Sequence, residues 1–167
     1  KFKLTYKSFG NNAILVKWPE LINEAILYDI KMLDETIQEE CFETVLETVP
    51  AYNSLTVLFD EDITTTTELI TKIQQIYVSV IENSSTGKSL WKLPVCYDIS
   101  FGKDLERLAK EKKLAIEELI KKHSEQVYNV HFIGFLPGFL YLGGLDKGLH
   151  TPRKATPDLH IEKGAVA

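Results

Sequence analysis

A short polar stretch divides this sequence into two parts of different character, and the division constrains the fold more than any other feature. Residues 82–89 read Glu-Asn-Ser-Ser-Thr-Gly-Lys-Ser, a composition typical of a linker. Residues 1–86 hold 6 basic and 14 acidic side chains, whereas residues 87–167 hold 13 and 10. Of the nine glycines, only Gly10 precedes the stretch. We therefore predict two domains, residues 1–85 and 88–167, with a boundary near Ser85.

The first part predicts an α+β domain. Apolar residues recur at helical spacing from Ile22 to Ile37, which predicts a helix over residues 20–38 with one buried face. Thr65 and Glu68 have the spacing of a capping box at the start of a second helix, which we expect to bury Leu69, Ile73, Ile76 and Val80. Short β-favouring runs predict strands at residues 4–8, 13–17, 44–49 and 55–59. This order predicts an antiparallel or mixed sheet covered on one face.

The first part carries no sign of catalysis. It has no histidine and no arginine, and its carboxylates are spread along helix surfaces, where solubility and charge pairing explain them. Its acidity argues against nucleic acid as a partner, because the phosphate backbone would be repelled. We interpret it as a scaffold or docking domain.

The second part begins with a predicted strand at residues 90–99, in which Pro94 suggests an edge position or a strand end. Two helices over residues 104–112 and 116–122 and a strand over residues 126–133 follow. On that last strand Asn129 and His131 share a face. This face either lines a polar pocket or is the solvent-facing side of a sheet.

The most unusual segment is the aromatic glycine loop, residues 133–146, which reads Ile-Gly-Phe-Leu-Pro-Gly-Phe-Leu-Tyr-Leu-Gly-Gly-Leu-Asp. Backbone bends alternate here with large apolar side chains, so the loop must be packed rather than solvated. Its glycine spacing matches neither GxGxxG nor GxxxxGK[ST], so neither familiar nucleotide site is encoded.

The Thr-Pro-Arg loop, residues 149–157, places Arg153 and Lys154 between two prolines. A rigid loop with these cations suits a carboxylate or phosphate, because arginine offers a planar bidentate fork. A charged turn in water is the alternative. Together the two loops predict a compact ligand or partner site.

Several other classes of protein are disfavoured. The four histidines lack the short spacing of a metal site, and no serine lies in a GxSxG elbow. No apolar run is long enough for a membrane span or a signal peptide. Cys41 and Cys96 are far apart, and we predict both as buried, reduced thiols in a cytoplasmic protein.

Several segments together carry a family resemblance along essentially the whole chain. The densest are residues 134–139 (Gly-Phe-Leu-Pro-Gly-Phe), 141–145 (Tyr-Leu-Gly-Gly-Leu) and 151–157 (Thr-Pro-Arg-Lys-Ala-Thr-Pro). Earlier pieces are residues 10–16, 49–55 and 93–97. In this order they resemble the family whose members are known as the 5-oxoprolinase B subunit, sporulation-kinase inhibitor or allophanate hydrolase subunit 1.

The resemblance implies an N-terminal α+β domain followed by a cyclophilin-like β-barrel domain. It implies an accessory subunit of an ATP-dependent 5-oxoprolinase, a lactam hydrolase that converts 5-oxoproline to glutamate, and the chain is not expected to be active on its own. The implied partners are a second cyclophilin-like subunit, which is the C component of 5-oxoprolinase, and a barrel-type subunit, which is its A component. ATP is used by the complex, and its site on this chain stays undetermined.

The resemblance also implies site residues but no catalytic residue and no metal ligand. His123, the aromatic glycine loop and Arg153 map onto family motif positions, and Arg153 is expected to bind an anion. The expected ligand-binding residues are Arg153, Thr151, His123 and His131 and, in the aromatic glycine loop, Gly134, Phe135, Pro137, Gly138 and Tyr141.

The chain departs from the family pattern in three places. Leu140 stands where a small residue or proline is common, and Asp158 stands where an arginine is common. A carboxylate beside a proposed anion site weakens it by repulsion of roughly 1 kcal/mol or more at short range. The family continues with further barrel strands beyond the position of Ala167, so we expect the second domain to be incomplete here.

Two other functions belong to the same resemblance. One is a protein inhibitor that binds a sensor histidine kinase. The other is a component of allophanate hydrolase, which requires a biotin-dependent carboxylase as a partner. The small, carboxylated ligand suggested by Arg153 favours the 5-oxoprolinase function.

Overall fold

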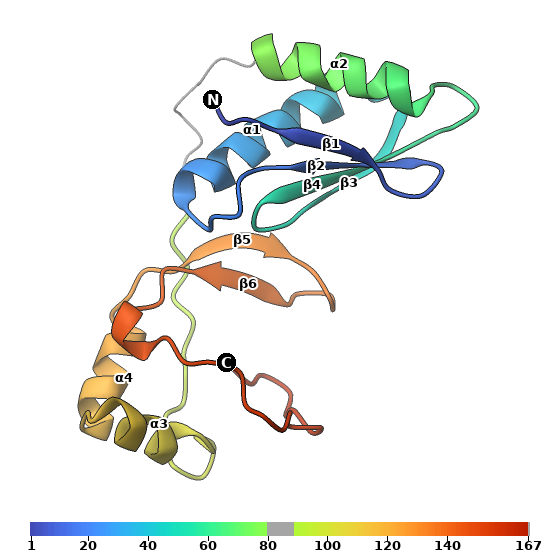
Figure 1. The fold of residues 1–167 in the computed structure, drawn as a ribbon. Coiled ribbons are helices and arrows are strands. Elements are labelled where there is room, and N and C mark those ends of the chain that lie inside the picture. The colour runs from blue at the N-terminus through green and yellow to red at the C-terminus, as the bar shows by residue number, and fades with distance from the viewer. Residues whose placement is uncertain (80–88, 167) are drawn as a thin grey trace. The chain divides into compact units, whose positions relative to one another are not determined.

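The computed structural model describes residues 1–79 and 89–166 and has an α+β fold, as the sequence predicts (Figure 1). These residues group into two units: the first comprises residues 1–92 and 128–143, and the second comprises residues 93–127 and 144–167. The boundary predicted near Ser85, like the buried position predicted for Val80, lies outside the described residues.

A four-stranded antiparallel sheet forms the first unit. Its strands are β1 (Thr5–Ser8), β2 (Ala13–Lys17), β3 (Val45–Pro50) and β4 (Ser54–Phe59). They lie in the order β1-β2-β4-β3, so β2 and β4 are central and β3 is an edge strand. The four predicted strands are therefore confirmed, and the sheet is antiparallel rather than mixed.

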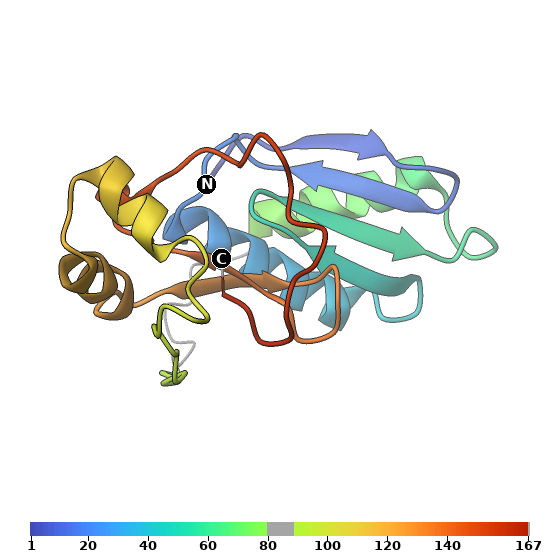
Figure 2. The same cartoon turned by 90° about the horizontal axis from the view of Figure 1, so that it is seen from below.

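Two helices, α1 (Glu24–Glu40) and α2 (Thr66–Ser79), cover one face of this sheet (Figures 1 and 2). Alternate residues of β2 and β4 point toward them, as period-2 side-chain geometry requires. The resulting core holds Ile14, Val16, Trp18, Ile26, Ile30, Leu33, Ile37, Cys41, Leu55, Val57, Phe59, Leu69, Ile73, Ile76 and Tyr77. Burying a large apolar side chain contributes about 1.5–3 kcal/mol, so this cluster supplies most of the stability of the unit.

The caps of the two helices explain where each begins. Asn23 caps α1, its side-chain oxygen accepting from the amide of Ile26 at 2.8 Å. Ile22, predicted to lie in the buried face, therefore precedes the helix and is exposed. At α2 the predicted capping box is confirmed: the Glu68 amide donates to Thr65 Oγ1 at 3.3 Å, and the Thr65 amide donates to Glu68 Oε2 at 3.0 Å.

A β-hairpin formed by β5 (Asn129–Ile133) and β6 (Leu140–Gly143) also belongs to the first unit. Part of the aromatic glycine loop is thus a strand. The predicted strand over residues 126–133 is confirmed only from Asn129 onward. Its predicted alternation is wrong, because a register shift between Val130 and Phe132 interrupts the pairing; His131 is buried whereas Ile133 is exposed.

The second unit is built from two short helices and a 3₁₀ turn. The helices α3 (Leu105–Lys112) and α4 (Ile116–Ser124) lie where the sequence predicts them. With the turn η1 (Lys147–Leu149) they bury Leu105, Ala109, Leu119 and Leu149. This core of four residues is far smaller than the core of the first unit.

The strand predicted at residues 90–99 is wrong. This segment has no regular secondary structure over residues 89–98, and no strand in the described part of the chain pairs with it. A strand needs a hydrogen-bonded neighbour, and Pro94 removes one donor. Cys96 lies in this segment and is exposed, so the prediction that it is buried is also wrong; Cys41 is buried as predicted.

Helices able to cross a membrane are absent from the described residues, since none is both long enough and apolar enough.

Candidate functional site

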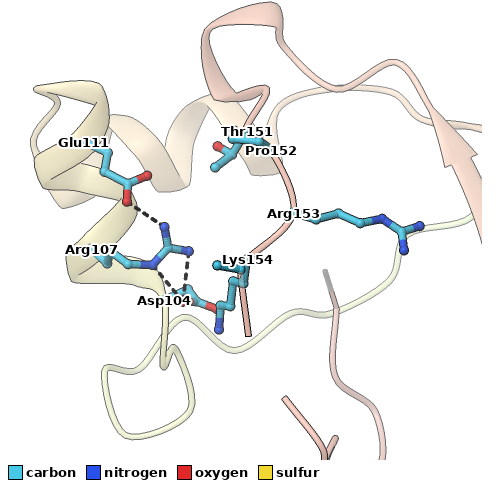
Figure 3. Close-up of a pocket in the computed structure, with 8 residues that line it drawn as sticks. Asp104, Arg107, Glu111, Thr151, Pro152, Arg153 and Lys154 are labelled. Carbon is cyan, nitrogen blue, oxygen red and sulfur yellow. Dashed lines mark hydrogen bonds and ion pairs between the residues drawn. The ribbon is translucent and has the colours of Figure 1, made fainter. Parts of the chain in front are cut away.

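The Thr-Pro-Arg loop and one face of α3 line an open cavity of about 510 Å³ (Figure 3). Leu149, the first residue of this loop, is buried against the helices of the second unit, which anchors the chain where it enters the cavity wall. The lining residues are Asp104, Arg107, Glu111, Thr151, Pro152, Arg153, Lys154 and Ala155. Three cations and two carboxylates therefore meet in one place, so the pairing among them decides what the cavity can bind.

On α3, Arg107 is held by carboxylates on both sides. Its Nη1 lies 2.7 Å from Glu111 Oε1, and its Nη2 lies 3.0 Å from Asp104 Oδ1. Spacings of three and four residues place all three side chains on one helix face. These hydrogen bonds raise the pKa of Arg107. Arg107 is thus paired with Glu111 on α3 and with Asp104, the residue just before the helix.

Lys154 joins the loop to α3. Its Nζ lies 2.7 Å from Asp104 Oδ2 and 2.7 Å from Asp158 Oδ2. The hydrogen bond from Lys154 is the main reason that the pKa of Asp104 lies below its usual value. Asp158, the residue that departs from the family pattern, therefore neutralises Lys154 rather than Arg153.

Arg153 is the cation of this cavity that keeps its charge available. It forms no hydrogen bond or ion pair with any residue that the structure describes, and its side chain extends away from the Arg107–Glu111 pair (Figure 3). Nearby, Thr151 Oγ1 donates to the carbonyl of Leu149 at 2.9 Å. Arg153 is therefore the guanidinium in this cavity that is able to bind a carboxylate or phosphate.

His123 lies on α4 and is not among the residues that line the cavity. Its Nδ1 lies 2.6 Å from the hydroxyl of Tyr97. Burial lowers the pKa of His123 below the usual value, so the ring is neutral at pH 7. The position of His123 suits a hydrogen-bonding role rather than a cationic one.

The hairpin of the first unit carries a second cluster, built around Tyr52 in the turn between β3 and β4. The hydroxyl of Tyr52 donates to the carbonyl of Leu142 at 3.1 Å. The rings of Phe132 and Tyr141 stack with their centroids 4.1 Å apart, and Tyr52 meets Phe132 edge-on at 5.1 Å. Such contacts tie the hairpin to the sheet domain through aromatic packing.

His131 lies in the middle of this cluster. Its ring is 7% exposed and lies 5.1 Å from the ring of Tyr52, and its Nδ1 has no hydrogen-bond partner in the described part of the chain. Burial lowers its pKa, while the charge of Glu24 opposes this shift. His131 is therefore a buried neutral ring, which decides against the solvent-facing interpretation of this position.

The turn of the hairpin exposes the remaining predicted residues. Phe135 is 85% exposed and adopts a φ of 62°, and Gly138 adopts a φ of 81°. Positive φ at these positions bends the chain back toward β6. Gly134 and Pro137 belong to the same turn, and Tyr141 is half-buried beside Phe132. The turn of the hairpin thus exposes an aromatic side chain, Phe135, whereas the paired strands beside it hold the packed rings of Phe132 and Tyr141.

The predicted site residues therefore fall into three groups. Arg153 and Thr151 share the cavity of the second unit. His123 belongs to that unit but pairs with Tyr97 instead. The others, His131 and the residues of the aromatic glycine loop, belong to the hairpin of the first unit.

Sequence reasoning missed the contribution of α3 to the cavity. The spacing of Asp104, Arg107 and Glu111 was available as a signal, because it places two carboxylates and an arginine on one face of a predicted helix. It also missed Tyr52 and Tyr97 as partners of the two histidines, since nothing local pairs residues so far apart in sequence. Within the described residues, no group of three His, Cys, Asp or Glu side chains is able to hold a metal ion.

The family described as carboxyltransferase domain, subdomain C and D, matches residues 4–167 of the chain. The chain belongs to this family. It is 32% identical over 170 residues to the 5-oxoprolinase B subunit of Bacillus subtilis (strain 168), an alignment that covers 96% of this chain and 71% of that protein. The family expected from the sequence motifs is thus confirmed.

Two further comparisons concern length and fold. The chain is 36% identical over 124 residues to the 5-oxoprolinase B subunit of Haemophilus influenzae, covering 74% of this chain and 57% of that protein. The crystal structure of TTHA0988 matches with a TM-score of 0.72 and 24% identity, covering 86% of this chain and 28% of that chain. The second likeness establishes a shared fold.

Proposed function

We propose that this chain is an accessory subunit of an ATP-dependent 5-oxoprolinase, a complex that hydrolyses 5-oxoproline to glutamate. The observation that carries the proposal is the 32% identity to the Bacillus subtilis 5-oxoprolinase B subunit over 96% of the chain. The proposal includes a cytoplasmic location and two partners, the cyclophilin-like C component and the barrel-type A component of the complex.

The reaction needs ATP because an unstrained lactam carbonyl is a poor electrophile. Transfer of the terminal phosphoryl group of ATP to the lactam oxygen gives an activated intermediate and ADP. Water then attacks the ring carbon, and the ring C–N bond opens with protonation of the nitrogen to give an acyl phosphate. A second water hydrolyses the acyl phosphate to glutamate and phosphate. The proposal assigns this chemistry to the assembled complex and not to this chain on its own.

In this proposal the cavity of the second unit binds the carboxylate of 5-oxoproline or of glutamate. Arg153 supplies the guanidinium, because Arg107 and Lys154 are already paired with carboxylates. A planar carboxylate accepts two parallel hydrogen bonds from such a fork. Thr151 lines the same wall. His123 in the second unit and, separately, His131 and the predicted residues of the aromatic glycine loop in the first unit remain proposed ligand-binding residues.

The proposal also includes the domain organisation expected of the family. Residues 1–85 form the N-terminal α+β domain, and residues 88–167 contribute to a cyclophilin-like domain. The four-stranded sheet with its two helices supports the first assignment. For the second, the support is the family match across residues 4–167.

Reconstitution tests the proposed function. The full-length protein is combined with the A and C components, and glutamate formation from 5-oxoproline and ATP is measured with and without it. We expect activity only when all three proteins are present. Equal activity of the A and C components without this protein would refute the proposal.

Substitution of Arg153 tests the proposed site within that complex. Arg153→Ala should raise KM for 5-oxoproline about tenfold or more, because a charge-assisted hydrogen bond contributes about 1.5–3 kcal/mol. Arg153→Lys keeps the charge but loses the bidentate guanidinium, so its KM should lie between that of the unsubstituted complex and that of Arg153→Ala. Lys163→Ala, which removes an exposed cation away from the cavity lining, is the matched control. Unchanged KM in Arg153→Ala would remove Arg153 from the site while leaving the accessory role of the chain intact.

A further inference from the structure

The edge of the sheet at β3 is open. β3 pairs with β4 on one side, and no strand in residues 1–79 or 89–166 pairs with its other side. An edge strand presents unpaired amide and carbonyl groups along that side, which makes it a template for an added strand. A register shift between Val45 and Glu47 interrupts the ladder at the start of β3.

A groove lined by both apolar and polar side chains follows this edge where α1 ends and β3 begins. Its volume is about 360 Å³, and it is lined by Gln38, Phe42, Val45, Leu46, Glu47 and Thr48. Phe42 is 73% exposed and Leu46 is 64% exposed, although both are large apolar side chains. Val49, further along the same strand, is 43% exposed. Apolar side chains gathered beside an open edge are typical of an interaction surface.

The charge around the groove is negative. Glu39, Glu43 and Glu47 are exposed, and none of them forms an ion pair with a residue in the described part of the chain. Glu40, by contrast, is paired with Lys72 at 3.1 Å. Of these three carboxylates Glu47 lines the groove, and Glu39 and Glu43 are next in sequence to the lining residues Gln38 and Phe42. No basic residue is among those that line the groove.

We infer that the β3 edge binds an extended, basic segment of another polypeptide. The segment adds a strand to β3, its apolar side chains contact Phe42 and Leu46, and its Lys or Arg side chains face the three carboxylates. Main-chain hydrogen bonds supply affinity in this mode, and alternate side chains supply specificity. The inference concerns the first unit and is independent of the Arg153 cavity.

The charge pattern disfavours a second copy of this chain as the occupant. Two β3 edges paired with each other would bring Glu47 and Glu43 of one copy close to the same carboxylates of the other. Like charges facing each other across a strand pair are destabilising. A basic partner removes this repulsion and gains complementary charge.

Two synthetic peptides test the inference with the full-length protein. One is an extended nonapeptide that alternates Val with Lys, and the other carries Glu in place of each Lys. Peptide binding is followed by fluorescence anisotropy and by ¹⁵N–¹H NMR shifts. We expect the basic peptide to bind at least tenfold more tightly, with shifts concentrated at residues 42–49. Equal binding of the two peptides, or binding of neither, would overturn the inference.

Variants locate the surface. Leu46→Lys places a cation in the groove and should weaken binding of the basic peptide about tenfold or more. Ile63→Lys is the matched control, because Ile63 is 57% exposed but lies in the connection between β4 and α2, outside the groove. Equal effects of both substitutions would overturn the assignment to β3. Sedimentation analysis at the same concentrations detects the remaining outcome, a dimer abolished by Leu46→Lys, which would show that a second copy is the occupant and overturn the inference.

Discussion

The sharpest test of the hairpin geometry is Gly143→Ala in β6. A Cβ at Gly143 would lie 2.9 Å from Cδ2 of His131 and closer still to its Nε2. The imidazole is buried against Tyr52 and has little room to move. The added methyl group must therefore displace the ring or separate the two strands.

The expected cost follows from this overlap. Inserting a methyl group into a well-packed site costs about 1–3 kcal/mol. Gly134→Ala is a matched control in the same hairpin, because a Cβ there meets its nearest neighbour, Phe132 Cδ2, at 3.5 Å, which is ordinary van der Waals contact. Gly134 also has no positive φ, so alanine is tolerated there and its cost should be close to zero.

Native-state hydrogen exchange of the β5 and β6 amides measures this difference directly. Gly143→Ala should reduce their protection by about 5- to 150-fold relative to Gly134→Ala, which corresponds to 1–3 kcal/mol. Adding His131→Ala should recover much of the loss, because the smaller side chain leaves space for the new methyl group. Equal protection in the two glycine variants, or no recovery in the double variant, would refute the close packing of His131 on Gly143.

Three further predictions concern stability and are measured by urea unfolding. Thr65→Ala should lower the free energy of unfolding by about 1 kcal/mol, because it removes the cap of α2, whereas Thr67→Ala, within the first turn, should change it far less; equal effects would contradict the cap. Leu33→Ala should cost about 2–5 kcal/mol, since Leu33 is fully buried, and a cost below 1 kcal/mol would contradict its place in the core. Burial lowers the pKa of His123 and His131, so the folded state binds fewer protons than the unfolded state; stability should fall as the pH drops below about 6.5, by at most about 1.4 kcal/mol per pH unit for each histidine, and a flat profile from pH 7.5 to 5.5 would contradict this.

Local signals predicted the first unit well. Apolar residues at spacings of three and four placed the buried face of α1, and the Thr65–Glu68 pair marked the start of α2. These signals act within one or two helical turns, so a single sequence contains them completely. The error at Ile22 arose because the apolar pattern extends to the N-terminal side of Asn23, whose side chain caps α1 and sets where the helix begins.

Long-range pairing explains the errors in the rest of the fold. Residues 90–99 have β-favouring composition, but a strand forms only where a partner strand offers hydrogen bonds. In β5, the register shift after Val130 reverses the faces of the residues that follow, and no local pattern marks its place. Both errors concern strand pairing, which depends on segments that are distant in the sequence.

The candidate site was predictable only in part for the same reason. Arg153 and Thr151 were found because proline-flanked cations stand out in one short loop. Whether Arg153 is free depends on Asp104, Glu111 and Asp158, which occupy the neighbouring cations. That distribution of ion pairs is a property of tertiary structure.

The contact between Tyr52 and Leu142 has a consequence for the order of folding. The two residues are 90 positions apart, so at typical synthesis rates the hairpin leaves the ribosome about 5–20 s after Tyr52. The four strands and two helices of the sheet domain are complete in sequence by Ser79, long before the hairpin exists. Docking of the hairpin is therefore expected to be a late folding step, and until it occurs the ring of Tyr52 stays available to other nascent chains and to chaperones.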